Sequence, residues 1–222
     1  MDKPHVARVL IVDDHPAVRE ALAMRISETS DLEVCGEAAS LAEALKLAEE
    51  QRPDLAVIDV SLASGDGLDL IKRIKGRGLD VKMLVWSMHS EALFAERALR
   101  AGARGYINKE QATSQIVDAM RQVLAGKIHL SPAMTETLLR RATGQGGEDL
   151  QRSPLETLSD RELEVLRLIG GGQKTAGIAQ QLCLSVKTVE TYRDRIRHKL
   201  NLPDGNALSR YAMRWVQDAS PD

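Results

Sequence analysis

Acidic, hydroxyl and amine side chains stand at the ends of short apolar runs in the first half of this 222-residue chain. Asp13 and Asp14 follow the run RVLIV, Asp59 ends LAVID, Ser87 ends VKMLVWS, and Lys109 follows RGYIN. Three carboxylates in one place repel one another unless a cation lies between them. Hard oxygen ligands favour Mg²⁺ or a similar divalent cation, and a carboxylate beside such an ion can attack phosphorus. These residues therefore predict magnesium-dependent phosphoryl transfer, provided that the fold brings them together.

The elements that would position these side chains alternate along the chain. Apolar runs predict strands at 8–12, 32–38, 55–59, 81–87 and 104–108. Apolar residues at helical spacing predict helices at 16–28, 41–50, 67–76, 90–101 and 113–125. This alternation predicts an α/β fold, a doubly wound parallel sheet of five strands in the order 2-1-3-4-5. Ligands bind at the carboxyl ends of the strands in such a sheet, which is where the polar side chains stand.

The pattern changes after Gly126, and no strand is predicted beyond it. Residues 132–141 predict one more helix, and the stretch 142–154 is rich in Gly and polar residues, which is typical of a linker. Four further helices are predicted at 160–170, 174–182, 186–200 and 205–217. We therefore expect four parts: a first domain at 1–126, a linker region at 127–156, a small all-α domain at 157–217 and a tail at 218–222.

Charge and composition differ between the two predicted domains and exclude several classes of protein. Residues 1–152 carry 20 Lys and Arg against 23 Asp and Glu, whereas residues 153–217 carry 10 against 7. The small domain is mildly basic and suits an anionic partner such as DNA. Aromatic residues make up only 3% of the chain, which argues against binding of single-stranded nucleic acid by stacking. No apolar stretch is long enough to span a membrane. Cys35 and Cys183 lie far apart in the sequence, and we expect free thiols and a cytoplasmic protein.

The helix predicted at 186–200 has two different faces. Apolar and aromatic residues recur at helical spacing and should be core: Val189, Tyr192, Ile196 and Leu200. The opposite face and its flanks are polar or charged: Lys187, Glu190, Thr191, Asp194, Arg195, Arg197 and His198. A short turn joins this helix to the preceding one, as in a helix-turn-helix. The polar face suits the major groove of double-stranded DNA, but a solvated surface has the same pattern.

The motifs RVLIVDDHPAVREAL, LAVIDVSL, MLVWSMHSE and AGARGYINKE together resemble a CheY-like receiver domain of a two-component response regulator, over about residues 6–125. The resemblance implies that Asp59 accepts a phosphoryl group from a sensor histidine kinase. It also implies that Asp14, Asp59 and the backbone carbonyl of Ser61 hold Mg²⁺, with Asp13 assisting.

Three further roles follow from the same resemblance. Lys109 matches the lysine that pairs with the phosphoryl group, Ser87 matches the switch hydroxyl, and Tyr106 matches the switch aromatic. From the residues alone, Tyr106 could equally be an aromatic at the edge of the sheet. The chain departs from the family at Ala63, four residues after the phosphoacceptor, where the family usually has Pro. This departure removes no chemical group from the site.

The stretch LSDRELEVLRLIGGGQKTAGIAQQLCLSVKTVETYRDRIRHKLNL resembles a LuxR-type helix-turn-helix of the NarL/FixJ class of response regulators, and the module covers about residues 157–217. Its base-contacting surface corresponds to Glu190, Thr191 and Asp194. Thr175 and Lys187 match positions that approach the DNA backbone. We place three neighbouring residues in the same DNA-binding surface: Thr188, Arg195 and Arg197.

The resemblance also implies a symmetric dimer on paired half-sites of promoter DNA. A single module with two acids on its reading face makes few phosphate contacts, so tight binding should need two copies. The helix with Ala212, Trp215 and Val216 matches the contact between the two modules. We expect phosphorylation of the first domain to favour this homodimer.

Three readings of the whole chain remain to be compared. The leading one is a transcription regulator controlled by phosphorylation of Asp59. The second is a DNA-binding regulator whose receiver is controlled by a partner without phosphate, for which Ala63 is the only support. The third is a phosphatase with an aspartate nucleophile, but such enzymes need a second acid two residues after the nucleophile, where this chain has Ser61. We therefore expect no enzyme beyond the receiver's own phosphotransfer and dephosphorylation.

Overall fold

The computed structural model describes residues 6–62, 65–109, 115–143, 154–182 and 184–218. The chain forms two compact units, residues 1–145 and 146–222, which are described separately below. Within the described ranges, no helix combines the length and the apolar character that crossing a membrane requires. The predicted thiol of Cys183 lies outside these ranges, whereas Cys35 is a free cysteine.

The first unit contains a parallel sheet of five strands in the order β2-β1-β3-β6-β7. Its strands are β1 (Ala7–Val12), β2 (Leu32–Ala38), β3 (Leu55–Ile58), β6 (Lys82–Ser87) and β7 (Gly105–Asn108). Two short strands, β4 (Ser61–Leu62) and β5 (Gly65–Asp66), form a separate antiparallel pair after β3. The five main strands have the predicted order, so the predicted α/β fold is confirmed.

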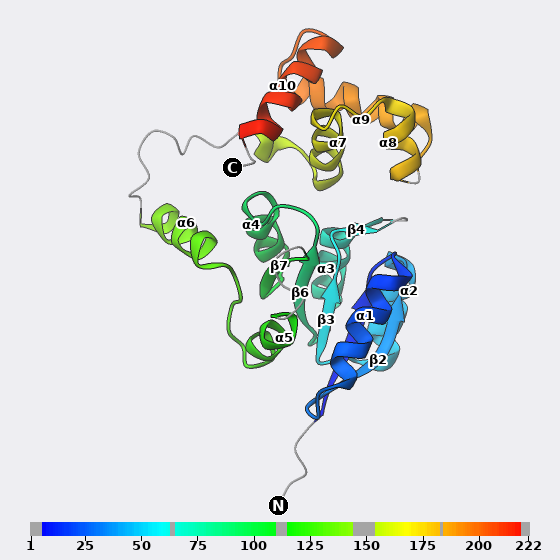
Figure 1. Cartoon of the computed structure of the whole chain (residues 1–222), viewed down its shortest axis with the longest axis vertical. Coiled ribbons are helices and arrows are strands. Elements are labelled where there is room, and N and C mark those ends of the chain that lie inside the picture. Colours follow the sequence, from blue (N-terminus) through cyan, green and yellow to red (C-terminus); the bar gives the residue numbers. More distant parts are fainter. Residues whose placement is uncertain (1–5, 63–64, 110–114, 144–153, 183, 219–222) are drawn as a thin grey trace, which may run out of the picture. The chain divides into compact units, whose positions relative to one another are not determined.

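Helices cover both faces of this sheet (Figure 1). The helices that connect or follow the strands are α1 (Pro16–Ser27), α2 (Leu41–Gln51), α3 (Gly67–Gly76), α4 (Glu91–Ala101) and α5 (Ile116–Leu124). Buried residues of α1 and α5 share one apolar core with β1, β3, β6 and β7. On the other face α3 packs between α2 and α4. Strands β1 and β3 are almost wholly buried, as expected for a parallel sheet that is covered on both faces.

The chain stays with the first unit beyond the predicted boundary at residue 126. Helix α6 (Pro132–Ala142) forms where one helix was predicted and contacts α4, and the compact unit extends to residue 145. Ser131 caps this helix by accepting a hydrogen bond from the amide of Met134. Most of the predicted linker 142–154 lies outside the described residues.

The second unit is helical throughout its described residues. It begins with a 3₁₀ turn, η2 (Pro154–Thr157), and continues with α7 (Asp160–Gly170), α8 (Thr175–Gln181), α9 (Val186–Lys199) and α10 (Gly205–Asp218). The predicted capping box at the start of α7 is present, with Ser159 and Glu162 bonding to each other's backbone amides. Helix α10 packs closely on α7 at Gly170, where a Cβ atom would overlap Ala212 and Val216. The predicted all-α module is therefore confirmed.

Candidate functional site

The polar residues predicted at the strand ends converge at one edge of the sheet. Asp13 follows β1, Asp59 follows β3, Ser87 ends β6 and Lys109 follows β7. Because these strands are neighbours and parallel, their carboxyl ends meet. Asp13, Asp59 and Ser87 are buried, and the Lys109 side chain is only 7% exposed. The predicted juxtaposition of these four side chains is present in the structure.

Donors on both sides hold the Asp59 carboxylate. Ser87 donates its hydroxyl to Asp59 Oδ1 at 2.6 Å, and the backbone amide of Ser61 donates to the same oxygen at 3.3 Å. Lys109 reaches the other oxygen, Oδ2, at 2.5 Å. Behind Asp59, a Cβ atom at Gly67 would lie 1.9 Å from the Asp59 carbonyl oxygen, so the first residue of α3 must be glycine here. The sequence reasoning did not identify Gly67, although its place just after β5 could have suggested a close approach.

Lys109 links two of the three acids. Its ammonium lies 2.5 Å from Asp13 Oδ2 and 2.5 Å from Asp59 Oδ2, and 5.4 Å from the centroid of the Trp86 ring. A buried ammonium between two buried carboxylates reduces their mutual repulsion. The same ammonium can stabilise negative charge that develops on a group attached to Asp59.

Asp14 and His15 extend the cluster toward solvent. One carboxylate oxygen from each of Asp13, Asp14 and Asp59, together with a ring nitrogen of His15, all lie within 4.8 Å of one another. Asp14 Oδ1 is buried and accepts no hydrogen bond within the described ranges, although His15 Nδ1 lies 2.8 Å away. A divalent cation fits this donor set, because it is rich in hard oxygen atoms that lie close together.

His89 connects the strand ends and was not predicted from the sequence. Its ring nitrogen Nε2 lies 2.6 Å from Ser61 Oγ. Its carbonyl oxygen accepts hydrogen bonds from the Tyr106 hydroxyl at 3.0 Å and from the side-chain Nδ2 of Asn108 at 3.1 Å. His89 lies two residues after Ser87, so the argument from strand ends could have included it.

Tyr106 points into the protein. The residue is 1% exposed, and burial raises the pKa of its hydroxyl far above the usual value, with the Asp59 charge adding to the effect. It is therefore a buried aromatic on the edge strand β7, joined through its hydroxyl to the loop after Ser87. Ala63, the predicted departure in the loop after Asp59, lies outside the described residues.

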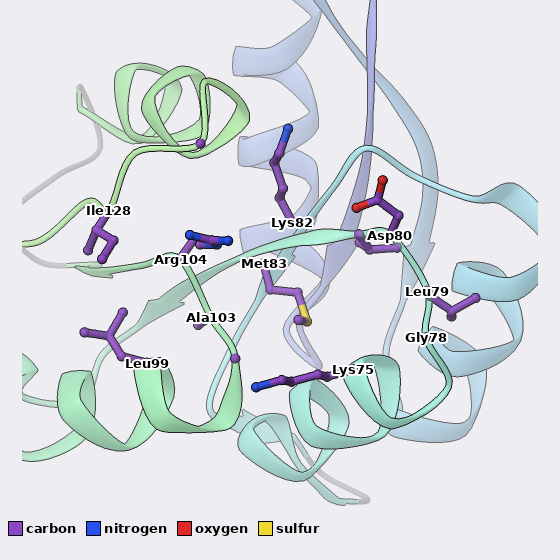
Figure 2. Close-up of a pocket in the computed structure, with 13 residues that line it drawn as sticks. Lys75, Gly78, Leu79, Asp80, Lys82, Met83, Leu99, Ala103, Arg104 and Ile128 are labelled. Atoms are coloured by element: carbon purple, nitrogen blue, oxygen red, sulfur yellow. The ribbon is translucent and has the colours of Figure 1, made fainter.

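A separate hollow of about 600 Å³ lies at the opposite end of the strands, beside the starts of β6 and β7 (Figure 2). Lys75, Lys82 and Arg104 line it around Met83. Helices α3, α4 and α5 all end beside it, and Lys82 donates to the carbonyl of Leu124 at the end of α5. Cations at helix C-termini offset the negative ends of the helices. This hollow contains none of the strand-end residues and is not the site of phosphoryl chemistry.

The predicted reading face of the second unit is exposed. On α9 the exposed side chains include Lys187, Glu190, Thr191, Asp194 and Arg195, while Val189 and Ile196 on the opposite face are fully buried. Helical spacing therefore separated the two faces, although two of the four predicted core residues, Tyr192 and Leu200, are only half-buried. Val186, the first residue of α9, is an exposed apolar residue that the sequence reasoning did not single out.

Other predicted DNA-binding residues are partly buried, and two of them bond to neighbouring residues. Thr175 begins α8 and is half-buried. Thr188 is half-buried, and its hydroxyl lies 2.7 Å from that of Ser185, the cap of α9. Arg197 donates to the carbonyl of Pro203 at 3.2 Å and lies 3.7 Å from Asp194. These contacts engage the side chains of Thr188 and Arg197 within the second unit, whereas the side chains of Lys187 and Arg195 are exposed.

The residues of α10 that were predicted to form the dimer contact also differ in burial. Ala212 is fully buried against α7, so its side chain is core within one module. Trp215 and Val216 are half-buried, and Met213 beside them is exposed. Of the predicted contact residues, Trp215 and Val216 therefore remain partly accessible to a second module, whereas Ala212 does not.

Two family models match the chain. Residues 9–121 match the response regulator receiver domain. Residues 156–212 match the bacterial regulatory proteins of the luxR family. Together the models cover both structural units, and the first alone covers half of the chain.

Named relatives span the whole chain. It is 42% identical to a putative transcriptional regulator of Pseudomonas aeruginosa. The matched 209 residues cover 94% of this chain and 98% of that protein. It is 36% identical over 214 residues to the response regulator GacA of Pseudomonas viridiflava, covering 96% and 99%.

A solved structure supports the same fold over both units. RcsB from Salmonella enterica serovar Typhimurium, bound to promoter P1flhDC in the presence of the phosphomimetic BeF₃⁻, matches with a TM-score of 0.61. It is 24% identical and covers 94% of this chain and 98% of that one, which shows the fold alone. The family models, the relatives and the fold agree: the chain belongs to the response regulators of the NarL/FixJ class and is a transcriptional regulator with a receiver domain and a LuxR-type DNA-binding domain.

Proposed function

We propose that this regulator is a cytoplasmic protein switched by phosphorylation of Asp59, with a sensor histidine kinase as the phosphoryl donor. The observation that carries the proposal is the pair of donors on one buried carboxylate. Ser87 donates to Asp59 Oδ1 and Lys109 to Asp59 Oδ2. A phosphoryl group attached to Asp59 would meet both donors in place, because they already point at its two oxygens.

The proposed step is a nucleophilic substitution at phosphorus. A carboxylate oxygen of Asp59 forms a P–O bond as the P–N bond of a phosphohistidine breaks, and the bonding electrons return to the imidazole. The Lys109 ammonium and the Ser87 hydroxyl then donate to the phosphoryl oxygens instead of to the carboxylate. The positive charge of Lys109 and the hydrogen bonds from both groups stabilise the negative charge that builds up on those oxygens.

A divalent cation such as Mg²⁺ is part of the proposal. Asp13, Asp14, Asp59 and the backbone carbonyl of Ser61 would hold it, and when bound it would neutralise charge on the phosphoryl oxygens. A carboxylate oxygen of Asp14 lies within 4.8 Å of carboxylate oxygens of Asp13 and Asp59, which supports this assignment. The hydrogen bond from the Ser61 amide to Asp59 supports a fixed position for the Ser61 backbone beside the nucleophile.

For the second unit we propose that α9 enters the major groove of double-stranded promoter DNA. Lys187 and Arg195 would contact phosphates, and Thr191 would lie among the bases with Glu190 and Asp194, whose carboxylates can accept from the amino group of cytosine. The exposed methyl groups of Val186 suit contact with a thymine methyl group. Thr175 and Thr188 would approach the DNA backbone from the amino-terminal turns of α8 and α9.

We also propose that phosphorylation favours a homodimer on two half-sites about one helical turn apart. The supporting observation is the surface of α10, where Met213 is exposed beside the half-buried Trp215 and Val216. A symmetric contact there would double the small number of phosphate contacts that one module can make.

The test compares wild type, Asp59→Asn and the control Asp54→Asn after treatment with acetyl phosphate and Mg²⁺, on Phos-tag gels. The amide of Asp59→Asn is nearly isosteric but cannot form an acyl phosphate, so labelling should be abolished. Asp54 lies at the other end of β3, where it accepts from the Arg8 amide, so its variant should label as wild type does. Labelling of Asp59→Asn at the wild-type level would contradict the assignment of the nucleophile.

The same samples test the consequence for DNA. Phosphorylated wild type should bind promoter DNA more tightly and sediment as a larger species than the untreated chain, whereas Asp59→Asn should show neither change. Equal binding and equal size with and without phosphate would remove the switching mechanism and leave a DNA-binding protein that is controlled in another way.

A further inference from the structure

Residues 127–142, which follow α5, do not leave the receiver but bind to its edge. His129 pairs with Gly105 of the edge strand β7 in a parallel bridge. The His129 amide donates to the carbonyl of Arg104 at 3.0 Å, and the Tyr106 amide donates to the carbonyl of His129 at 2.9 Å. A Cβ atom at Gly105 would lie 2.9 Å from the His129 carbonyl oxygen, so the glycine permits this close approach.

The same segment is attached to α4 at two more points. The Ser131 amide donates to the carboxylate of Glu91, the first residue of α4, at 2.8 Å. Farther along, Arg141 of α6 forms an ion pair with Glu96 of α4. The segment therefore bonds to β7 and to α4 at the same time.

This attachment is not tightly packed. A cavity of about 280 Å³ lies between the segment and the receiver, lined by Glu91, Tyr106, His129 and Ser131 among others. Met134 is the one residue of α6 that is buried, and Leu139 on the same helix is 60% exposed. Segments with few buried apolar contacts open at low free energy. The hydrogen bonds hold the segment without an apolar core that would make the attachment permanent.

The anchors of the segment lie on β7, which carries Tyr106, and on α4, which follows the end of β6 at Ser87. Tyr106 bonds to His129 through its amide and to the carbonyl of His89 through its hydroxyl. Glu91 follows Ser87 by four residues, with His89 between them. A movement of Ser87 toward a phosphoryl group would therefore displace the loop that ends at Glu91 relative to β7.

We propose that residues 127–142 form a latch, docked on β7 and α4 while Asp59 is unmodified and released when Asp59 is phosphorylated. The proposal rests on phosphorylation of Asp59 and adds the way in which the state of the site reaches the chain between the two units. The contacts of the latch with β7 and α4 are called its seam. A displacement of one of these elements relative to the other breaks hydrogen bonds at the seam. Release detaches residues 127–142, which precede the DNA-binding module in the sequence, from the receiver.

The test measures hydrogen exchange of three amides that bond across this seam, those of Tyr106, His129 and Ser131, in the full chain with and without beryllium fluoride and Mg²⁺. Fluorine NMR of the beryllium fluoride bound at Asp59 reports occupancy separately. We expect exchange at the three amides to become at least about tenfold faster on occupancy. Amides of the central strands, such as that of Ile11, should keep their rates.

Two variants test the anchors independently, since either could disturb its own element. Glu91→Ala removes the acceptor for Ser131, and His129→Pro removes the donor to Arg104. Each should give fast exchange at Tyr106 before beryllium fluoride is added and little further change afterwards. The matched control is Glu136→Ala, which is on α6 and forms an ion pair with Arg140 of the same helix; it should respond as wild type does.

The outcomes separate the latch from the function on which it rests. Full occupancy at Asp59 with unchanged or slower exchange at the seam would overturn the latch and leave phosphorylation intact. A failure of beryllium fluoride to occupy Asp59, together with a failure of acetyl phosphate to label it, would overturn both.

Discussion

The strand-end site of the receiver and the exposed face of α9 both consist of charged and hydroxyl side chains, but they hold these side chains in opposite ways. In the receiver, Asp13, Asp59 and Lys109 are buried and bonded to one another. On α9, Lys187 and Glu190 extend into solvent. Buried charges interact strongly and need partners, whereas exposed charges are screened and contribute little to stability.

This difference shows what each region is built to do. A site that must place one phosphoryl group needs fixed donors, and burial fixes them because every alternative position leaves a charge without a partner. A face that must meet DNA needs side chains whose bonds are still available, and it obtains its partners only from the ligand. Substitutions in the two regions should therefore separate stability from binding.

The largest effect on stability is expected for Lys109→Met in the receiver. Removing the ammonium leaves two buried carboxylates facing each other, and breaking a buried pair in this way costs about 3 to 5 kcal/mol. Chemical unfolding in EDTA should show this loss, and millimolar Mg²⁺ should restore part of it, because a cation can replace the ammonium between the acids. Equal stability of the variant and wild type in EDTA would contradict a charge-balanced site.

A buried pair in the second unit gives a smaller effect and a dependence on pH. Lys199 lies 2.6 Å from the buried carboxylate of Glu162 but is itself partly exposed, so Lys199→Met should cost about 1 to 2 kcal/mol. Burial raises the pKa of Glu162, but the hydrogen bond from Lys199 and the bonds at Ser159 outweigh it and hold this pKa below its usual value of 4.5.

The sign follows from that lowered pKa. The contribution of Glu162 to stability is present above about pH 4.5 and is lost as the pH falls through the lower pKa of the folded protein. Unfolding of the second unit measured between pH 3 and pH 7 should therefore show a steeper acid-side loss in wild type than in Lys199→Met. Parallel curves would mean that the pair does not set the acid response.

Asp14→Asn should alter cation binding with little change in the fold. The variant loses one charged ligand of the proposed Mg²⁺ site, so affinity measured by calorimetry should fall at least about tenfold, and labelling by acetyl phosphate should slow. Asp54→Asn is the matched control, with an acid at the opposite end of the same sheet, and should bind Mg²⁺ as wild type does. Equal losses in both variants would contradict the strand-end site.

The smallest effect on stability is expected for Lys187→Ala on α9, within about 0.5 kcal/mol of wild type. Its effect should appear in DNA binding instead: affinity falls a few-fold, and the slope of log affinity against log salt decreases by about 0.9, as for one lost phosphate contact. Lys46→Ala, an exposed lysine of the receiver, should leave the slope unchanged. An unchanged slope for Lys187→Ala would place this residue away from the phosphates.

The sequence alone predicted much of this molecule because the rules involved are local or follow from topology. Alternating apolar runs and helical patterns predicted the sheet and its order. Residues at strand ends predicted the meeting of Asp13, Asp59, Ser87 and Lys109, since parallel neighbouring strands leave no other place for them. Spacing of 3 and 4 residues separated the buried and exposed faces of α9.

Tertiary structure decided what depends on distant partners. No local pattern assigns the Lys109 ammonium to both Asp13 and Asp59, the His89 carbonyl to Tyr106, or the side chain of Ala212 to the core beneath α7. Residues 127–131 fall within the predicted linker region, yet they bind β7 because the edge strand has unpaired backbone groups and Gly105 admits a close neighbour. Sequence periodicity determines which face of an element is apolar. Only the assembled sheet and its edges determine which polar groups still need a hydrogen-bond or ion-pair partner, and which residues provide it.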